Sequence, residues 1–286
     1  MKKIKYLLQA IILIFLLTIF KMVGIKVARL ISSNIMRKIG PYFRSRKTIE
    51  KNLELAFNNI SNHEKNLITK NMWSTYGKIL AEYVFMRDFR KTSSTQKITV
   101  IGQKTLDEIK KSGKPVIFIS GHFDNFELMA LHIEKSGIDL TTIYRPLNNI
   151  FLNPLMEIIR KKFICKKQIK KGLSGTRLIL KNFKKNSSIA LMIDQRVSQG
   201  IKVNFFSKAA LTTSIPAQFV KKFKCQIVPI YIERKADDNF NLKIFDPINF
   251  SNEDTIEAIT LNLNKILENM ILNNPNQWIW THNRWK

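Results

Sequence analysis

Short apolar runs rich in β-branched residues alternate with helix-like stretches after residue 97, and this alternation constrains the fold more than any other feature of the sequence. The clearest run, residues 115–120 (PVIFIS), has the composition of a buried strand. Because strands and helices alternate, the sequence predicts an α/β domain with a central sheet. The other expected strands are residues 138–144, 189–193, 226–232 and 241–245, and the expected helices are residues 124–136, 154–162, 174–185, 213–224 and 253–272, the last capped by Ser251 and Asp254.

The N-terminus carries an apolar run over residues 4–20 that contains only Lys5, Gln9 and Thr18 as polar interruptions. A spanning helix needs about 20 apolar residues, whereas residues 6–20 supply fifteen. A short span, an interfacial helix and a signal peptide all fit this length, and a buried core helix is the remaining alternative. Basic residues stand where a signal peptide has its small-residue cleavage site, which favours a retained membrane anchor over residues 1–26.

Basic side chains flank the apolar run at both ends, so the positive-inside bias does not choose between a spanning and an interfacial anchor. Residues 45–90 follow with an amphipathic helical pattern, and residues 91–96 read as a polar connector. The expected organisation is therefore an anchor over residues 1–26, a helical region over residues 27–96 and an α/β core over residues 97–286.

The charge of the chain predicts an anionic partner. Its 286 residues include 48 Lys and Arg against 21 Asp and Glu, which gives a net charge of +27. The two cysteines, Cys165 and Cys225, are far apart and form no metal-binding pattern, so the sequence predicts neither a disulfide framework nor a metal site. The catalytic part is expected in a reducing compartment.

A histidine follows the clearest strand, where α/β folds gather their sites. His122 lies in the segment GHFDNFE, residues 121–127, and Glu127 stands five residues further on at the start of an expected helix. This spacing allows the carboxylate to orient the imidazole, and an imidazole so oriented is a competent general base for a hydroxyl. The alternative is a helix-capping histidine with an acid placed favourably near the helix N-terminus.

GHFDNFE resembles the HX4(D/E) motif of glycerolipid-type acyltransferases, and the surrounding sequence is similar to the late acyltransferases of lipid A biosynthesis, the lauroyl/myristoyl transferase family. Further matching blocks cover nearly the whole chain in the order expected: YRPLNN at 144–149, NPL at 153–155, MIDQ at 192–195, FF at 205–206 and QWIWTHNRWK at 277–286. The resemblance implies a mixed central sheet flanked by helices, with an N-terminal anchor helix.

The resemblance further implies transfer of a fatty acyl chain from acyl carrier protein to a hydroxyl of a 3-hydroxyacyl chain on a Kdo-bearing, phosphorylated lipid A precursor. His122 and Glu127 are the implied catalytic pair, and no cofactor is implied beyond the acyl carrier protein thioester. Arg145 and Arg160 are candidate phosphate or carboxylate ligands, with a salt bridge as the alternative for Arg160. Asp194 and Asn125 complete the expected substrate contacts, and Asp194 ranks below Glu127 as a partner of the imidazole. The implied location is the cytoplasmic side of the inner membrane.

Three other functions are compatible with parts of the pattern. The HX4E chemistry does not specify its acceptor, so another glycolipid or a lysolipid is an alternative substrate. A non-enzymatic protein that binds anionic lipid is a second alternative, although the intact His122 and Glu127 count against it. Nucleic-acid binding has only the net charge in its favour, because the sequence contains no recognisable nucleic-acid-binding motif.

Overall fold

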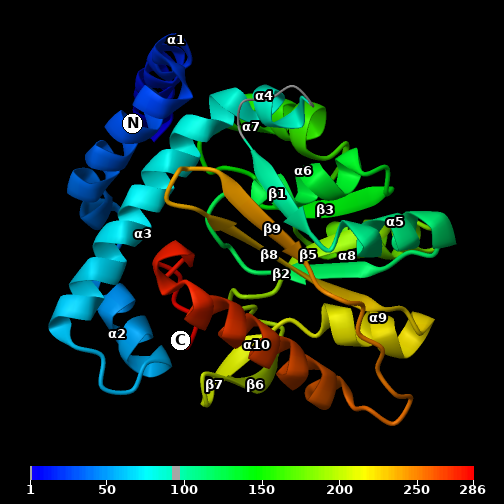
Figure 1. The fold of residues 1–286 in the computed structure, drawn as a ribbon. Coiled ribbons are helices and arrows are strands. Elements are labelled where there is room, and N and C mark those ends of the chain that lie inside the picture. The colour runs from blue at the N-terminus through cyan, green and yellow to red at the C-terminus, as the bar shows by residue number, and fades with distance from the viewer. Residues whose placement is uncertain (1, 92–96) are drawn as a thin grey trace.

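The computed structural model describes residues 2–91 and 97–286 and has a seven-stranded sheet at its centre (Figure 1). The strand order is β1-β9-β8-β2-β5-β3-β4, and a separate hairpin is formed by β6 and β7. Within the seven-stranded sheet, neighbouring strands are parallel except for the antiparallel pair β8–β9, so the expectation of a mixed sheet flanked by helices is confirmed. The strands are β1 (Ile98–Ile101), β2 (Ile117–Ser120), β3 (Leu140–Tyr144), β4 (Lys167–Lys170), β5 (Ser188–Met192), β6 (Ile201–Phe205), β7 (Lys208–Thr212), β8 (Ile227–Arg234) and β9 (Phe240–Ile244).

All five strands expected from the sequence are present, and four further strands were not expected. β1 and β4 are four-residue strands at the two edges of the sheet, and β4 (KQIK) carries lysines at both ends. Such short, half-exposed strands lack the continuous apolar run that marks a central strand. The expected polar connector falls on residues 92–96, which lie outside the described part of the chain, and on Lys91.

The helices cover the sheet and build the N-terminal region. The five helices expected after residue 97 are all present, but the last one, α10, begins at a different cap. Thr255 Oγ1 accepts a hydrogen bond from the Ala258 backbone at 3.1 Å, whereas Ser251 and Asp254 form a turn before the helix. The helices are α1 (Lys2–Phe43), α2 (Arg46–Ala56), α3 (Asn62–Glu82), α4 (Met86–Arg90), α5 (Gln103–Ser112), α6 (Glu127–Lys135), α7 (Asn153–Ile159), α8 (Leu173–Phe183), α9 (Ile215–Phe223) and α10 (Ile256–Asn273), with short η1 (Tyr83–Phe85), η2 (Arg160–Ile164) and η3 (Pro275–Gln277).

Helix α1 extends well past the apolar run and packs along α3 at one side of the molecule (Figure 1). It is broken at Gly24, whose φ of 80° lies in the left-handed region that glycine tolerates. Within the described residues it is the one helix apolar and long enough to cross a membrane, with a mean hydropathy of 2.4 over its most apolar window. One side of the helix is covered by the body, because Ala10, Leu17 and Phe20 are buried.

A buried cluster of four charges joins α1, α3, β8 and the loop after β2. Glu82, at the end of α3, accepts hydrogen bonds from Arg29 Nε at 2.5 Å and from Arg234 Nη1 at 2.5 Å. Arg234 Nη2 also donates to Asp124 Oδ1 at 2.6 Å. Asp124 has a φ of 33°, which is unusual for a residue with a side chain. The cluster balances two negative against two positive charges and holds the loop that contains His122 in its strained path.

Replacing Arg234 with methionine tests how far this cluster stabilises the fold. The R234M variant leaves two buried carboxylates with one fewer cation, so its free energy of unfolding should fall by about 3–5 kcal/mol. The matched control is R46M, because Arg46 pairs with Glu50 in an exposed position and such pairs contribute less than about 1 kcal/mol. Denaturant unfolding in detergent micelles measures both; equal losses in the two variants would contradict the assignment.

Candidate active site

His122 and Asp194 come from neighbouring parallel strands that end at the same edge of the sheet. β2 pairs with β5 so that Ser120 lies opposite Met192. His122 and Asp194 each stand two residues beyond this last pair, on the loops that follow the two strands. The sheet register therefore places the imidazole beside the carboxylate, at the edge where α/β folds carry their sites.

The Asp194 carboxylate is buried and accepts three hydrogen bonds. One oxygen, Oδ1, lies 2.8 Å from His122 Nδ1. The other, Oδ2, accepts from the His122 backbone N–H at 2.8 Å and from the Trp278 indole Nε1–H at 2.9 Å. Because two of the three donors belong to His122, the carboxylate fixes both the backbone and the ring of this residue.

This arrangement sets the tautomer of the imidazole. An ionised carboxylate only accepts hydrogen bonds, so Nδ1 of His122 carries the proton and Nε2 keeps its lone pair. Among the hydrogen bonds of the described residues, none involves Nε2 of His122. The side chain is 21% exposed. The ring can therefore accept a proton at Nε2 from a group that approaches from the surface.

Glu127 does not make the contact expected of it. It is the first residue of α6, and its Oε1 accepts hydrogen bonds from Tyr83 at 2.6 Å and from Arg160 Nε at 2.8 Å. These partners lie in η1 and η2, and among the hydrogen bonds of the described residues none joins Glu127 to His122. The structure thus assigns the orienting contact to Asp194, and the higher rank given to Glu127 from the sequence is corrected.

The charges around His122 raise its pKa. Burial alone would lower the pKa of the imidazole, but the charge of Asp194 and its hydrogen bond to Nδ1 outweigh burial, and the more distant Glu127 charge adds to them. The same pair lowers the pKa of Asp194 against the effect of its own burial. His122 is therefore protonated over a wider pH range than an ordinary histidine, and its basic form prevails only above this raised pKa.

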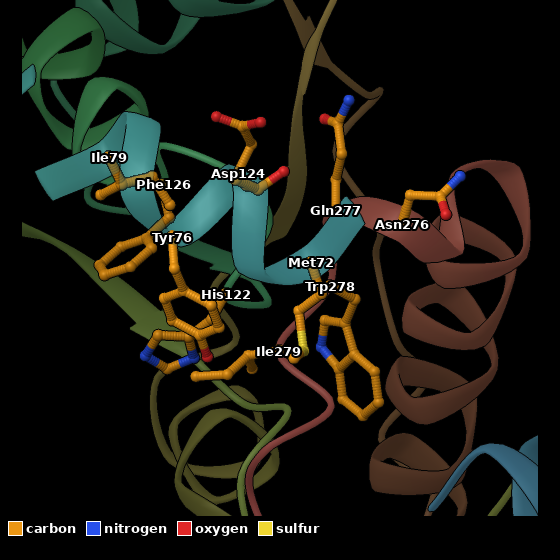
Figure 2. Close-up of a pocket in the computed structure, with 11 residues that line it drawn as sticks. Met72, Tyr76, Ile79, His122, Asp124, Phe126, Asn276, Gln277, Trp278 and Ile279 are labelled. Atoms are coloured by element: carbon orange, nitrogen blue, oxygen red, sulfur yellow. The ribbon is translucent and has the colours of Figure 1, made fainter. Parts of the chain in front are cut away.

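A small cavity of about 30 Å³ adjoins the imidazole and is lined mainly by α3 and the C-terminal segment. In Figure 2, His122, Tyr76, Met72, Ile279 and Trp278 gather on one side of the pocket, while the Asp124 carboxylate points away from them. A space of this size holds about one water molecule. The apolar surroundings strengthen the electrostatic coupling between His122 and Asp194.

The other candidate residues fall into two groups. Asn125 is buried, and its amide Nδ2 donates to Glu82 Oε2 at 2.7 Å. The turn therefore directs Asn125 into the charge cluster, and the expectation that it contacts substrate is corrected. Arg160 is 14% exposed and binds Glu127 and the Tyr83 hydroxyl, which makes it an internal salt bridge. Arg145 is exposed at the end of β3.

Arg145 and Lys171 extend the same sheet edge with positive charge. They follow Tyr144 and Lys170, which lie opposite each other on β3 and β4, and the Lys171 backbone N–H donates to the Tyr144 carbonyl at 2.9 Å. Because the order of strands is β2-β5-β3-β4, the edge carries His122, Asp194, Arg145 and Lys171 in succession. With strands about 4.8 Å apart, the two cations lie about 10–15 Å along the edge from His122.

Sequence reasoning missed several residues that build the site. Trp278 donates a hydrogen bond to Asp194 and Tyr83 donates one to Glu127, and no local spacing in the sequence indicates either contact. His282 lies within electrostatic range of His122 and Asp194, and its Nε2 accepts from the Arg196 backbone at 3.0 Å. Burial lowers the pKa of His282. In residues 2–91 and 97–286, His, Cys, Asp and Glu side chains form no group of three that fits a metal ion.

The reactivity of His122 towards diethyl pyrocarbonate tests its pairing, because the reagent modifies neutral imidazole. The modification rate of His122 should rise with pH through a midpoint above 6.5, the ordinary pKa. In D194N the imidazole stays buried but loses the Asp194 charge that raises its pKa, so the midpoint of the modification rate of His122 should fall below 6.5. Mass spectrometry of peptides separates His122 from the other histidines, and an unchanged midpoint in D194N would contradict the pairing.

Three comparisons place the chain among known proteins. The family model described as bacterial lipid A biosynthesis acyltransferase matches residues 1–286. The chain is similar to the lipid A biosynthesis lauroyltransferase of Escherichia coli, at 26% identity over 253 residues that cover 85% of this chain and 79% of the relative. It is also similar to the E. coli lipid A biosynthesis palmitoleoyltransferase, at 26% identity with 86% and 80% covered.

A lipid A biosynthesis acyltransferase of Haemophilus influenzae is 19% identical over 240 residues, with 83% of this chain and 74% of the relative covered. Among solved structures, the 1-acyl-sn-glycerophosphate acyltransferase PlsC from Thermotoga maritima aligns with a TM-score of 0.41 and 12% identity, over 87% of this chain and 98% of that chain. Since the family model matches residues 1–286, the chain belongs to the bacterial lipid A biosynthesis acyltransferases.

Proposed function

We propose that the protein transfers a fatty acyl chain from acyl carrier protein to a hydroxyl of a 3-hydroxyacyl chain on a Kdo-bearing lipid A precursor. The observation that carries this proposal is the His122–Asp194 pair, whose free Nε2 lies at the accessible edge of the sheet in a member of the lipid A acyltransferase family. The relatives named for lauroyl and palmitoleoyl transfer match this chain at the same 26% identity, so the proposal specifies no chain length.

In the proposed mechanism His122 is the general base and Asp194 its positioning residue. Nε2 of His122 removes the proton of the acceptor hydroxyl while the oxygen attacks the carbonyl carbon of the thioester. The new C–O bond forms, the C–S bond breaks, and the imidazolium returns the proton to the departing thiolate of the carrier. The thioester itself supplies the activation, so the proposal includes no cofactor and no covalent enzyme intermediate.

In this proposal Glu127 stabilises the charged form of His122 instead of orienting its ring. Its carboxylate holds Arg160 and Tyr83, and its charge contributes to the raised pKa of His122. The negative charge therefore stabilises the imidazolium that forms in the transition state, from a greater distance than Asp194 does. Glu127 remains part of the proposed catalytic machinery, although it does not orient the ring.

The positive sheet edge suits anionic substrates. Arg145 and Lys171 are exposed beside the site, and a phosphorylated sugar lipid and an acidic carrier protein both complement their charge. The net charge of the whole chain, +27, is also positive and favours binding to an anionic membrane surface. Because the proposed acyl donor is a cytosolic carrier, the proposal places the α/β core on the cytoplasmic side of the inner membrane, with α1 as its anchor.

Removing the imidazole of His122 tests whether this residue is the general base. H122A should reduce turnover by about 10²–10⁴-fold, because proton removal by a positioned base contributes a factor of this size. Mass spectrometry of lipids from cells that carry H122A in place of the wild type should show a lipid A that lacks one secondary acyl chain. H132A is the matched control, because His132 lies on α6 and bonds Gln103. Lipids with a full set of acyl chains in H122A cells would contradict the proposal.

The role of the positive edge is tested by neutralising it. The R145Q/K171Q double variant should raise the KM for the phosphorylated acceptor by about tenfold with little change in kcat, since the two cations lie away from the reacting atoms. K104Q is the control for a general change in charge, because Lys104 is an exposed lysine on α5. Steady-state kinetics with acyl carrier protein thioester give both constants, and a loss of kcat with unchanged KM would oppose a binding role.

A further inference from the structure

The first half of α1, residues 2–23, is apolar on two opposite sides. Its inner side packs on the body through Leu17 and Phe20, which belong to the main hydrophobic core. A helix of this length extends about 33 Å, and the body leaves its outer side uncovered. The exposed apolar side chains on that outer side recur at helical spacing: Ile4, Leu7, Leu8, Ile11, Ile12 and Phe15.

A second apolar segment lies directly beside the start of this helix. Asn149 Nδ2 donates to the Tyr6 carbonyl at 2.8 Å, although the two residues are far apart in the sequence. The Asn149 Oδ1 accepts from the Phe151 backbone N–H at 3.0 Å and so shapes the loop. The next two residues, Ile150 and Phe151, are 53% and 40% exposed. Leu147 and Ile158 are also exposed apolar residues of this segment.

Exposed lysines border both apolar segments. Lys2, Lys3 and Lys5 lie at the start of α1, and Lys161 and Lys162 follow α7. An apolar zone bordered by cations matches the layers of a membrane, in which acyl chains lie beneath anionic headgroups. A soluble acidic protein would complement the lysines but would leave the apolar side chains without a matching partner.

We propose that the outer side of α1 and the segment 147–158 form one lipid-contacting surface, so that α1 lies in the membrane interface beside the body. Because Ala10, Leu17 and Phe20 are buried against the body, this half of the helix lies along the body rather than projecting away from it. The segment 147–158 begins near the end of β3, at the sheet edge that carries His122. Insertion of this surface into the membrane brings the sheet edge with His122 to the bilayer. The proposal does not depend on which group the site transfers.

Fluorescence quenching by brominated lipids tests contact at the loop. The full-length F151W variant is mixed with vesicles of phosphatidylglycerol and phosphatidylcholine whose acyl chains carry bromine. The fluorescence of the introduced tryptophan is the emission of the variant minus that of the wild type. It should be lower by about half or more in brominated than in unbrominated vesicles, because interfacial residues insert to the depth of the upper acyl chains. L272W is the matched control, since Leu272 is also an exposed apolar residue but lies on α10, and the fluorescence of its introduced tryptophan should stay unchanged. Unquenched F151W emission would overturn the proposal and leave the surface to a protein partner.

Cysteine accessibility tests the path of the helix. In a C225S background, K3C places a single accessible thiol near the start of α1, and K26C places one just beyond the break at Gly24, while Cys165 stays buried. In sealed inside-out membrane vesicles, a membrane-impermeant maleimide should label both positions at rates within about threefold of each other, because both ends of an interfacial helix stay on one side. Labelling of one position in inside-out vesicles and of the other only in right-side-out vesicles would show a crossing helix and overturn the proposal.

Discussion

The three hydrogen bonds that converge on the buried Asp194 carboxylate are the interaction on which the site depends. A buried carboxylate is costly unless its lone pairs are satisfied, and here the donors are the ring and backbone of His122 and the indole of Trp278. The same contacts that make burial tolerable also select the tautomer of the imidazole. Stability and reactivity therefore share one cause at this edge of the sheet.

The rest of the fold serves to hold this pair in register. The alignment of β2 with β5 brings the two residues together, and the strained turn after β2 is tied by Asp124 to Arg234 and, through Glu82, to Arg29 of α1. The helix that carries the apolar N-terminus is thus connected to the loop that contains His122 by buried charges. In the proposed membrane contact of α1, this connection sets the distance of the site from the membrane as well as retaining the protein there.

The sequence predicted the central strands and most helices because these elements carry long periodic patterns. It also predicted that a histidine at the end of the 115–120 strand would sit at the edge of the sheet. It failed for β1 and β4, because these edge strands are half-exposed and lack the continuous apolar run of the central strands, and it failed for the partner of His122. Glu127 is near His122 in sequence, whereas Asp194 is near it only through the pairing of β2 with β5, and local spacing carries no information about such a pairing. Trp278 is buried, and its indole contact with Asp194 depends on the path of the whole chain.

The most direct test of the His122–Asp194 pair is the pH dependence of kcat/KM for acyl transfer in the wild type, D194N and E127Q. The wild-type rate should rise with pH through a midpoint above 6.5, the ordinary pKa. D194N should lose about a hundredfold in rate and shift its midpoint to lower pH, while E127Q should shift the midpoint by a smaller amount. A profile in which E127Q shows the large shift and D194N keeps the wild-type midpoint would contradict the account.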